Sequence, residues 1–197
     1  MVAPATVNNP RAILSMLVSF LERETRVVLY GRAALALGFS AAPEAFTVTR
    51  DVDAILPGAE LAAIEADEQF WRALDRTNCA LEPSGLYMTH LFVDEQVILS
   101  PDWLAKIVPL ALPEMKHLRL YRPCVLDLVL TKMMRRDPQD LSDIEFLLGR
   151  EPLTEGQLVD AFAGARCPDI DEIRMSFVVL QSMVLALARQ AGGRPSQ

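Results

Sequence analysis

The sequence predicts an α+β fold followed by an all-helical region. Up to about residue 122, short β-branched runs bounded by glycine or proline alternate with segments of helical periodicity. From Pro123 onward only helical periodicity continues. We therefore expect a short mixed sheet flanked by helices over residues 1–122, a helical bundle over 123–190, and a flexible tail over 191–197.

The chain begins with an expected helix, strand and second helix. Asn9 before Pro10 is typical of an N-cap and first helical turn, and apolar residues recur at helical spacing to about Glu24. The run "RVVLY" predicts a buried strand that ends at Gly31. The following "AALALGF" is rich in helix formers and is expected to close at Gly38.

The next expected strand, "FTVTRDVDAIL" over residues 46–56, contains two aspartates, Asp51 and Asp53. Side chains alternate along a strand, so these two carboxylates point the same way. Like charges this close repel, and a divalent cation is the usual neutraliser. A solvated strand end, with its acids paired to Arg50 or to another arginine, is the structural alternative.

The remaining elements follow from the same patterns. Residues 59–75 carry apolar positions at helical intervals. The runs "GLYMTHLF" and "QVILS" flank a short polar turn and predict a hairpin, and "LRLY" predicts another short strand. The segments "VLDLVLTKMMRR" and "LSDIEFLL" predict helices, as do a segment after Thr154 and residues 169–189.

Composition limits the class of protein. The net charge of -7 argues against a surface devoted to nucleic acid, so an RNA or DNA partner would be met locally. Cys79, Cys124 and Cys167 lack CxxC spacing, so neither a disulfide framework nor a zinc site is indicated and the cytoplasm is the expected location.

The N-terminus shows no secretory signal. The longest apolar run, "MSFVVLQSMVLALA", is shorter than the roughly 20 residues of a membrane span, so no membrane partner is expected.

Two further features suit phosphate binding. A glycine turn that opens a helix, as at Gly31, directs backbone N–H groups and the positive helix end toward an anion. Lys132, with Arg135 at i+3 or Arg136 at i+4, is expected on one helix face, where it can meet the charge of a triphosphate. Each feature has a structural alternative. Gly31 could be a plain turn residue, and Lys132 could be an ion-pair partner of Asp143.

At this point "YGRAALALGF", "TRDVDAIL" and "TKMMRRDPQDLSDIEFLL" together resemble the nucleotidyltransferase superfamily of the polymerase beta type. The nearest branches in pattern are the bacterial minimal and AbiEii-like toxin proteins, and the resemblance covers roughly residues 26–148. It implies a nucleotidyltransferase-like fold in which Gly31 touches nucleotide phosphates. It also implies that Asp51 and Asp53 hold Mg²⁺ (or Mn²⁺) and that Lys132 meets the nucleotide.

The sequence departs from that pattern in two places. Arg32 replaces the second glycine or serine of the family turn, where its guanidinium either contacts phosphate or obstructs the pocket. The third carboxylate of the family has no clear match, because Asp94 and Glu95 fall in the expected turn and His90 lies on the partner strand. Taken alone, His90 reads as a packed or exposed residue.

The acids that follow Lys132 have a structural interpretation. Asp137 before Pro138, with Asp140 three residues later, resembles a helix-capping arrangement.

The predicted function is magnesium-dependent transfer of a nucleoside monophosphate from an NTP to a hydroxyl of an RNA (tRNA) or a protein, in a toxin–antitoxin or defence context with a possible cognate partner. Asp51 and Asp53 would hold the metal, Gly31 and Arg32 would cradle phosphate, and Lys132 and Arg135 would neutralise the triphosphate. The first alternative is a catalytically degenerate member that binds a nucleotide or a partner protein. The second is an interaction protein built on the apolar C-terminal helices.

Overall fold

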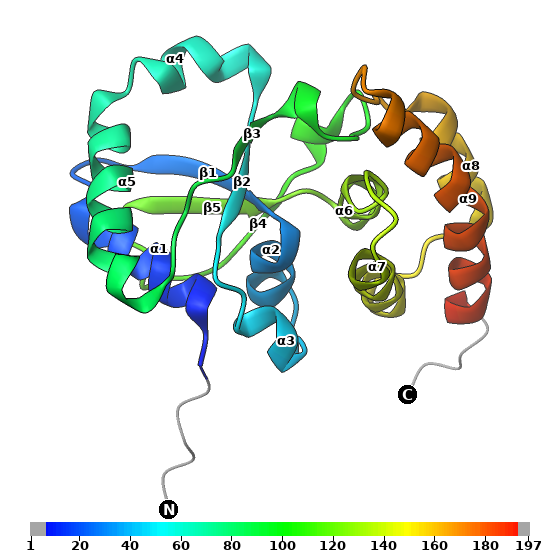
Figure 1. Ribbon diagram of the computed structural model, residues 1–197, viewed down its shortest axis with the longest axis horizontal. Helices are drawn as coiled ribbons and strands as arrows, with labels where there is room; N and C mark the ends of the chain where they lie inside the picture. Colours follow the sequence, from blue (N-terminus) through cyan, green and yellow to red (C-terminus); the bar gives the residue numbers. More distant parts are fainter. Residues whose placement is uncertain (1–6, 193–197) are drawn as a thin grey trace, which may run out of the picture. The chain divides into compact units, whose positions relative to one another are not determined.

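The computed structural model describes residues 7–192 and shows an α+β protein with a small mixed sheet, flanking helices and a C-terminal helical region, as the sequence predicts (Figure 1). The five strands lie in the order β3-β2-β1-β5-β4. The strands are β1 (Thr25–Tyr30), β2 (Asp53–Leu56), β3 (Leu91–Val93), β4 (Val108–Pro109) and β5 (Leu118–Arg122).

The central strand β1 has one antiparallel and one parallel neighbour, which makes the sheet mixed. It pairs antiparallel with β2, with Tyr30 opposite Asp53, and parallel with β5, with Val28 opposite Tyr121. The side chains of residues 27–29 are all buried, so both faces of β1 are covered.

The chain divides into two compact units that are not continuous in sequence. The sheet unit comprises the chain up to Leu91 together with Pro109–Arg122. The helical unit comprises Phe92–Val108 together with the chain from Pro123 onward. Residues 92–108 therefore group with the C-terminal helices.

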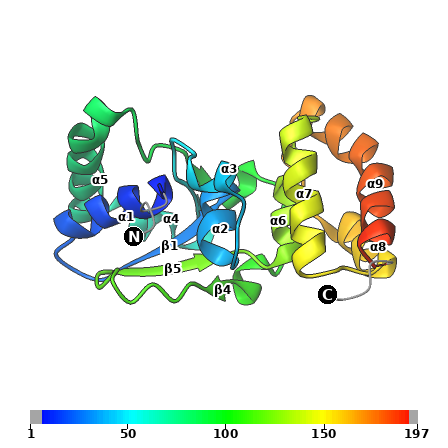
Figure 2. The same ribbon diagram turned by 90° about the horizontal axis from the view of Figure 1, so that it is seen from below.

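The helices of the sheet unit are mostly short (Figure 2). In this unit α1 packs on α5, and α2 packs on α3. The helices are α1 (Asn9–Phe20), α2 (Gly31–Gly38), α3 (Glu44–Thr47), α4 (Leu61–Glu65) and α5 (Glu68–Leu81), with single 3₁₀ turns η1 (Gly58–Glu60) and η2 (Glu82–Ser84).

The helical unit contains four α-helices and two short 3₁₀ helices within the described residues. In this unit α9 packs on both α7 and α8. Its elements are η3 (Asp94–Gln96), η4 (Trp103–Lys106), α6 (Val125–Thr131), α7 (Pro138–Arg150), α8 (Glu155–Gly164) and α9 (Asp171–Gly192).

The predicted strand over residues 46–56 is wrong in its first half. Residues 44–47 form α3, whose backbone turn is closed by Val48 N–H donating to the carbonyl of Glu44 at 3.2 Å. Asp51 makes a single parallel bridge to Tyr87, and the continuous strand begins only at Asp53. Of the β-branched residues before Asp51, Thr47 therefore lies in α3 and Val48 donates its N–H to that helix instead of to a strand.

Three other predicted elements are also corrected. The helix expected over 59–75 breaks, because Asp67 accepts from Phe70 N–H at 3.0 Å and so caps the start of α5. Asn8, and not Asn9, caps α1, by accepting from Arg11 N–H at 3.0 Å. The hairpin expected around the polar turn does not form: β3 is a neighbour of β2, while Leu99 forms an isolated antiparallel bridge with Arg166.

The last helix is longer than the apolar run suggested. α9 continues to Gly192, so only residues 193–197 of the predicted tail lie outside the described residues. By length and composition alone it could cross a membrane, with a mean hydropathy of 1.2 over its most apolar window and 28% of that window buried. Core helices meet the same criteria, and α9 packs along one face on α7 and α8.

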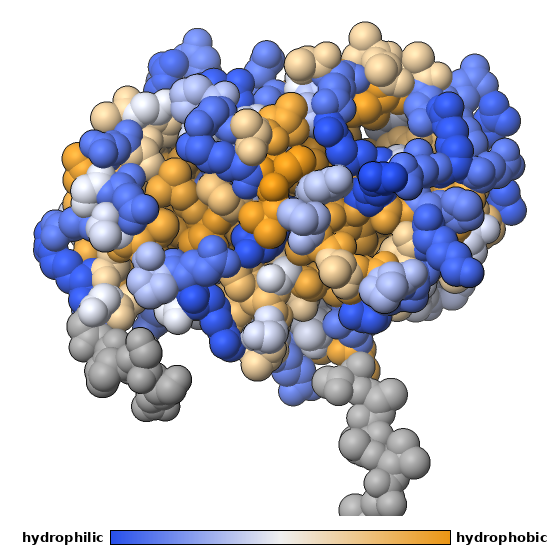
Figure 3. Space-filling view, turned by 180° about the vertical axis from the view of Figure 1, so that it is seen from behind, coloured by the Kyte–Doolittle hydropathy of each residue, from blue (hydrophilic) through white to orange (hydrophobic). Residues whose placement is uncertain are grey.

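Four large hydrophobic side chains of α9 are exposed. They are Met175, Val178, Val179 and Met183. Hydrophobic residues also reach the surface between hydrophilic ones on the side of the molecule drawn in Figure 3. Exposed apolar residues are ordinary in proteins, and the polar side chain of Ser182 is exposed among these four.

Candidate metal and nucleotide site

The turn between β1 and α2 favours glycine. Gly31 has φ +64°, in the left-handed region that residues with a Cβ rarely adopt. A Cβ on this residue would lie 2.9 Å from Oδ2 of Asp53, well inside normal contact distance. The backbone turn and the Asp53 carboxylate are therefore fitted to each other.

Asp51 and Asp53 are held at the start of β2 by backbone and side-chain contacts. Tyr87 N–H donates to the carbonyl of Arg50 at 3.1 Å, and Val52 N–H donates to the carbonyl of Tyr87 at 3.1 Å. Thr49 Oγ1 donates to Asp51 Oδ1 at 2.7 Å. Asp51 and Asp53 are both partly exposed as residues, although Oδ1 of Asp53 itself is buried.

The third member of the cluster is His90. Ala54 N–H donates to the carbonyl of His90 at 3.0 Å, which places the imidazole beside the first residue of β2. His90 Nδ1 lies 3.2 Å from Asp53 Oδ1, and the ring meets Tyr87 edge-on, with centroids 6.3 Å apart. Its position is thus determined by the neighbouring strand.

Together Asp51, Asp53 and His90 offer three ligand atoms within 4.8 Å of one another. Among the His, Cys, Asp and Glu side chains of residues 7–192, these three form a group that could together hold a metal ion. Two carboxylate oxygens and an imidazole nitrogen can share one divalent cation, which would also offset the repulsion between the carboxylates.

Sequence reasoning missed His90 as a member of this cluster. The residue pattern around it predicts a hairpin with the segment that follows, whereas residues 87–90 actually lie beside residues 50–54. No local signal indicates this parallel pairing, because its two partners are far apart along the chain.

Asp94, one of the acids near the expected third carboxylate, is occupied elsewhere. This residue is buried in the helical unit, where Asp94 Oδ2 accepts from Trp103 Nε1 at 3.0 Å and from Arg166 at 3.1 Å. Its carboxylate therefore anchors a loop to the C-terminal helices, and Glu95 beside it is exposed.

Arg32 occupies the second residue of the family turn and lies in the first turn of α2. Its guanidinium carbon lies 5.3 Å from the centroid of the Phe46 ring in α3. This is a cation–π distance, so the side chain contributes to the packing of α2 on α3. A role of Arg32 in phosphate binding stays a prediction.

Lys132 and Arg135 do not share a helix face, contrary to the sequence prediction. α6 ends at Thr131, Lys132 is its C-cap, and Arg135 lies in the connection to α7. Lys132 Nζ contacts Asp140 Oδ1 at 2.9 Å and Asp143 Oδ2 at 2.6 Å, while Arg135 Nε contacts Asp140 Oδ2 at 2.5 Å.

Lys132, Asp140 and Asp143 form the buried part of this ion cluster in the helical unit. The side chain of Lys132 is 8% exposed and that of Asp143 is fully buried. Asp140 is therefore an ion-pair partner rather than a cap, whereas Asp137 does cap α7 by accepting from Gln139 N–H at 2.8 Å. The ion-pair interpretation of Lys132 and Asp143 is confirmed, and a contact of Lys132 or Arg135 with nucleotide stays a prediction.

The three cysteines are free thiols. Burial raises the pKa of the Cys124 thiol to about 11, and its Sγ lies 3.2 Å from Asp127 Oδ2. A thiol with so high a pKa is a weak nucleophile at neutral pH, so Cys124 acts as a packed side chain.

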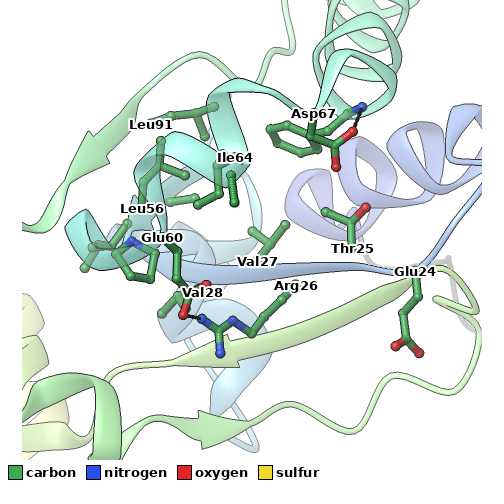
Figure 4. A pocket seen from close by; sticks show the side chains of 15 residues that line it. Glu24, Thr25, Arg26, Val27, Val28, Leu56, Glu60, Ile64, Asp67 and Leu91 are labelled. Carbon is green, nitrogen blue, oxygen red and sulfur yellow. Dashed lines mark hydrogen bonds and ion pairs between the residues drawn. The ribbon is translucent and has the colours of Figure 1, made fainter.

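A separate cavity of about 260 Å³ lies between the sheet and α4 (Figure 4). Its lining includes Val27, Leu56 and Ile64, and an ion pair between Arg26 and Glu60 lies at its rim. Asp51, Asp53 and His90 are not among the residues that line it. The cavity is thus not part of the carboxylate cluster.

A small mixed sheet that carries a glycine turn beside two aspartates at i and i+2 defines a protein of the nucleotidyltransferase class. Residues 13–148, more than half of the chain, match a family described as "Nucleotidyltransferase of unknown function (DUF6036)". The protein belongs to this family. No curated protein and no solved structure matches the chain.

Proposed function

We propose that the protein transfers a nucleoside monophosphate from an NTP to an acceptor hydroxyl, with pyrophosphate as the second product. The observation that supports this most strongly is the fitted contact between the Gly31 turn and the Asp53 carboxylate, in a chain that belongs to a nucleotidyltransferase family. Nucleotide phosphates and a divalent cation need such adjacent anion-binding and cation-binding groups.

In this proposal each part of the site has a separate task. Asp51 and Asp53 would hold the divalent cation, which supplies charge neutralisation at the reacting phosphate. The α2 N-terminus has no side-chain cap at Tyr30, and its positive end would bind phosphate oxygens. Arg32 would add a cation on the same turn. A contact of Lys132 and Arg135 with the triphosphate stays a prediction from the sequence.

The reaction is a displacement at the α-phosphorus. The acceptor oxygen forms a new bond to that phosphorus, and the bond from the phosphorus to the oxygen that bridges to the β-phosphate breaks. The electron pair leaves with pyrophosphate, and the hydroxyl proton is released to water. Positioning and electrostatic stabilisation account for most catalysis in phosphoryl-type transfer.

The acceptor proposed here is an RNA, with a tRNA end first and a protein hydroxyl second. The net charge of -7 favours a small contact area with RNA rather than an extended one. A role in a cytoplasmic toxin–antitoxin pair is part of the proposal, and copurification of a partner from native cells would support it.

The test is pyrophosphate release from each of the four NTPs, with Mg²⁺ or Mn²⁺ and total cellular RNA. Wild type is compared with Asp51→Asn/Asp53→Asn and with the control Glu65→Gln/Asp75→Asn, which removes two exposed carboxylates elsewhere in the sheet unit. We expect release in wild type and control and a loss of at least about 100-fold in the first double variant. Equal release in all three proteins would contradict the proposal.

The second candidate is a degenerate family member that binds nucleotide without turnover. His90 in place of a third acid, and Arg32 in place of a small residue, favour it. Metal-dependent NTP binding that requires Asp51 and Asp53, without pyrophosphate release from any NTP, would support this candidate over the transferase.

A further inference from the structure

The metal-ligand cluster differs chemically from an all-oxygen site. Asp51 and Asp53 contribute carboxylate oxygens, and His90 contributes a ring nitrogen, all within 4.8 Å of one another. Mg²⁺ prefers oxygen ligands in near-octahedral geometry, whereas imidazole favours transition metals. Mn²⁺ suits carboxylate and water ligands as Mg²⁺ does, but as a first-row transition metal it also accepts an imidazole nitrogen more readily than Mg²⁺.

The position of His90 is built into the fold. Its carbonyl accepts from Ala54 N–H, so the residue is tied to β2 immediately beside Asp53. Its ring is further oriented by Tyr87 and by the 3.2 Å contact between Nδ1 and Asp53 Oδ1. The side chain is 51% exposed, so a small ion and its remaining water or phosphate ligands can reach the ring.

We propose that His90 is a ligand of the metal ion and that it makes this site select Mn²⁺ over Mg²⁺. This role rests on the metal site of the proposed function but needs no turnover. The competing arrangement is one in which His90 only positions Asp53 through their direct contact. In that case the ion keeps an all-oxygen shell and the preference for Mn²⁺ does not depend on the imidazole.

The chain offers a matched control, because its sequence contains two histidines. His117 is exposed and belongs to the loop before β5. The variants are His90→Asp, which restores an oxygen ligand, His90→Ala, which removes the ligand, and His117→Asp. The full-length protein is prepared without a histidine tag, so that every imidazole nitrogen belongs to one of these two residues.

The first measurement is the affinity for Mn²⁺ and for Mg²⁺ by calorimetry. We expect wild type and His117→Asp to bind Mn²⁺ at least about tenfold more tightly than Mg²⁺, and His90→Asp to lose that preference. His90→Ala should lose about 10–100-fold in Mn²⁺ affinity. An unchanged ratio of the two affinities in His90→Asp would overturn the proposal.

The second measurement is pulsed electron paramagnetic resonance on the Mn²⁺-loaded protein. A bound imidazole produces ¹⁴N modulation, which we expect in wild type and His117→Asp and not in His90→Asp. Wild type without ¹⁴N modulation would show that His90 only positions Asp53. Mn²⁺ selectivity without pyrophosphate release would support the metal-ligand role of His90 and count against the transferase. Pyrophosphate release from a protein that does not prefer Mn²⁺ would support the transferase and overturn the role of His90.

Discussion

At the scale of single residues, Gly31 links backbone conformation to the chemistry of the site. Its positive φ and its close approach to Asp53 are two separate constraints, and a side chain would violate both. Gly85 provides a useful comparison, because its φ of +65° is nearly the same but nothing lies within 4 Å of its Cβ position. The pair allows backbone strain to be separated from steric displacement.

We predict that Gly31→Ala lowers Mn²⁺ affinity by about tenfold or more, because the new methyl group displaces the Asp53 carboxylate. Gly85→Ala should leave metal affinity unchanged. Both variants should lose about 1–2 kcal/mol of unfolding free energy from left-handed strain. Calorimetric metal titration and urea unfolding check these expectations, and equal metal affinity in the two variants would refute the steric argument.

The residue scale also shows what sequence could predict about the site. Asp51 and Asp53 are separated by two positions, so strand alternation brings their carboxylates together even though the strand is shorter than expected. His90 could not be found this way, because its place depends on pairing between distant segments. Lys132 was read as an ion-pair partner or a nucleotide ligand, and only packing at the end of α6 shows its two carboxylate partners.

At the scale of elements, the junction between α6 and α7 is held by a buried ammonium. Lys132 contacts Asp140 and Asp143, both nearly or fully buried, whereas the side chain of Arg135 is 65% exposed while it contacts the same Asp140. The two cations should therefore differ in their contribution to stability, because removal of a buried cation leaves its carboxylate partners as uncompensated buried charges. An exposed ion pair is screened by water.

We predict that Lys132→Met lowers the free energy of unfolding by about 3–5 kcal/mol, because it leaves two buried carboxylates without their cation. Arg135→Met, the control, should cost about 0–1 kcal/mol. Urea denaturation of each variant measures the difference. Comparable losses in the two variants would contradict the argument that burial makes Lys132 the more important of the two cations.

The sequence predicts best those helices that begin at a capping residue or a glycine turn. α8 begins where Thr154 accepts from Gln157 N–H in a capping box, and α2 follows the glycine turn as expected. The strand over 46–56 and the hairpin were wrong, because β propensity does not reveal which partner a segment finds. Tertiary pairing decides such segments.

At the scale of the whole molecule, the helical unit contains a segment inserted between two parts of the sheet unit. Residues 92–108 depend on later residues: Asp127 accepts from Ser100 N–H at 2.7 Å, and Arg166 contacts both Asp94 and Leu99. Trp103 in this segment is 2% exposed. Removal of the chain after residue 122 would take these partners away.

We predict that a fragment ending at Arg122 leaves residues 92–108 unfolded, because Asp127 and Arg166 are absent. The two tryptophans allow this to be measured: in a Trp71→Phe background only Trp103 reports. Its fluorescence maximum should shift to longer wavelength in the fragment relative to the full chain. Trp71, observed in a Trp103→Phe background, is the control and should shift less, while a Trp103 maximum that stays in place would disprove the dependence.

The parallel pairing of β1 with β5 has a consequence for synthesis on the ribosome. β1 emerges early, but one of its two neighbours does not exist until residue 122 has left the exit tunnel. The inserted segment waits longer still, until Arg166 has been made. Between the synthesis of β1 and that of β5 the nascent chain therefore carries an incomplete sheet, whose unpaired strand edges are exposed to aggregation or to chaperones.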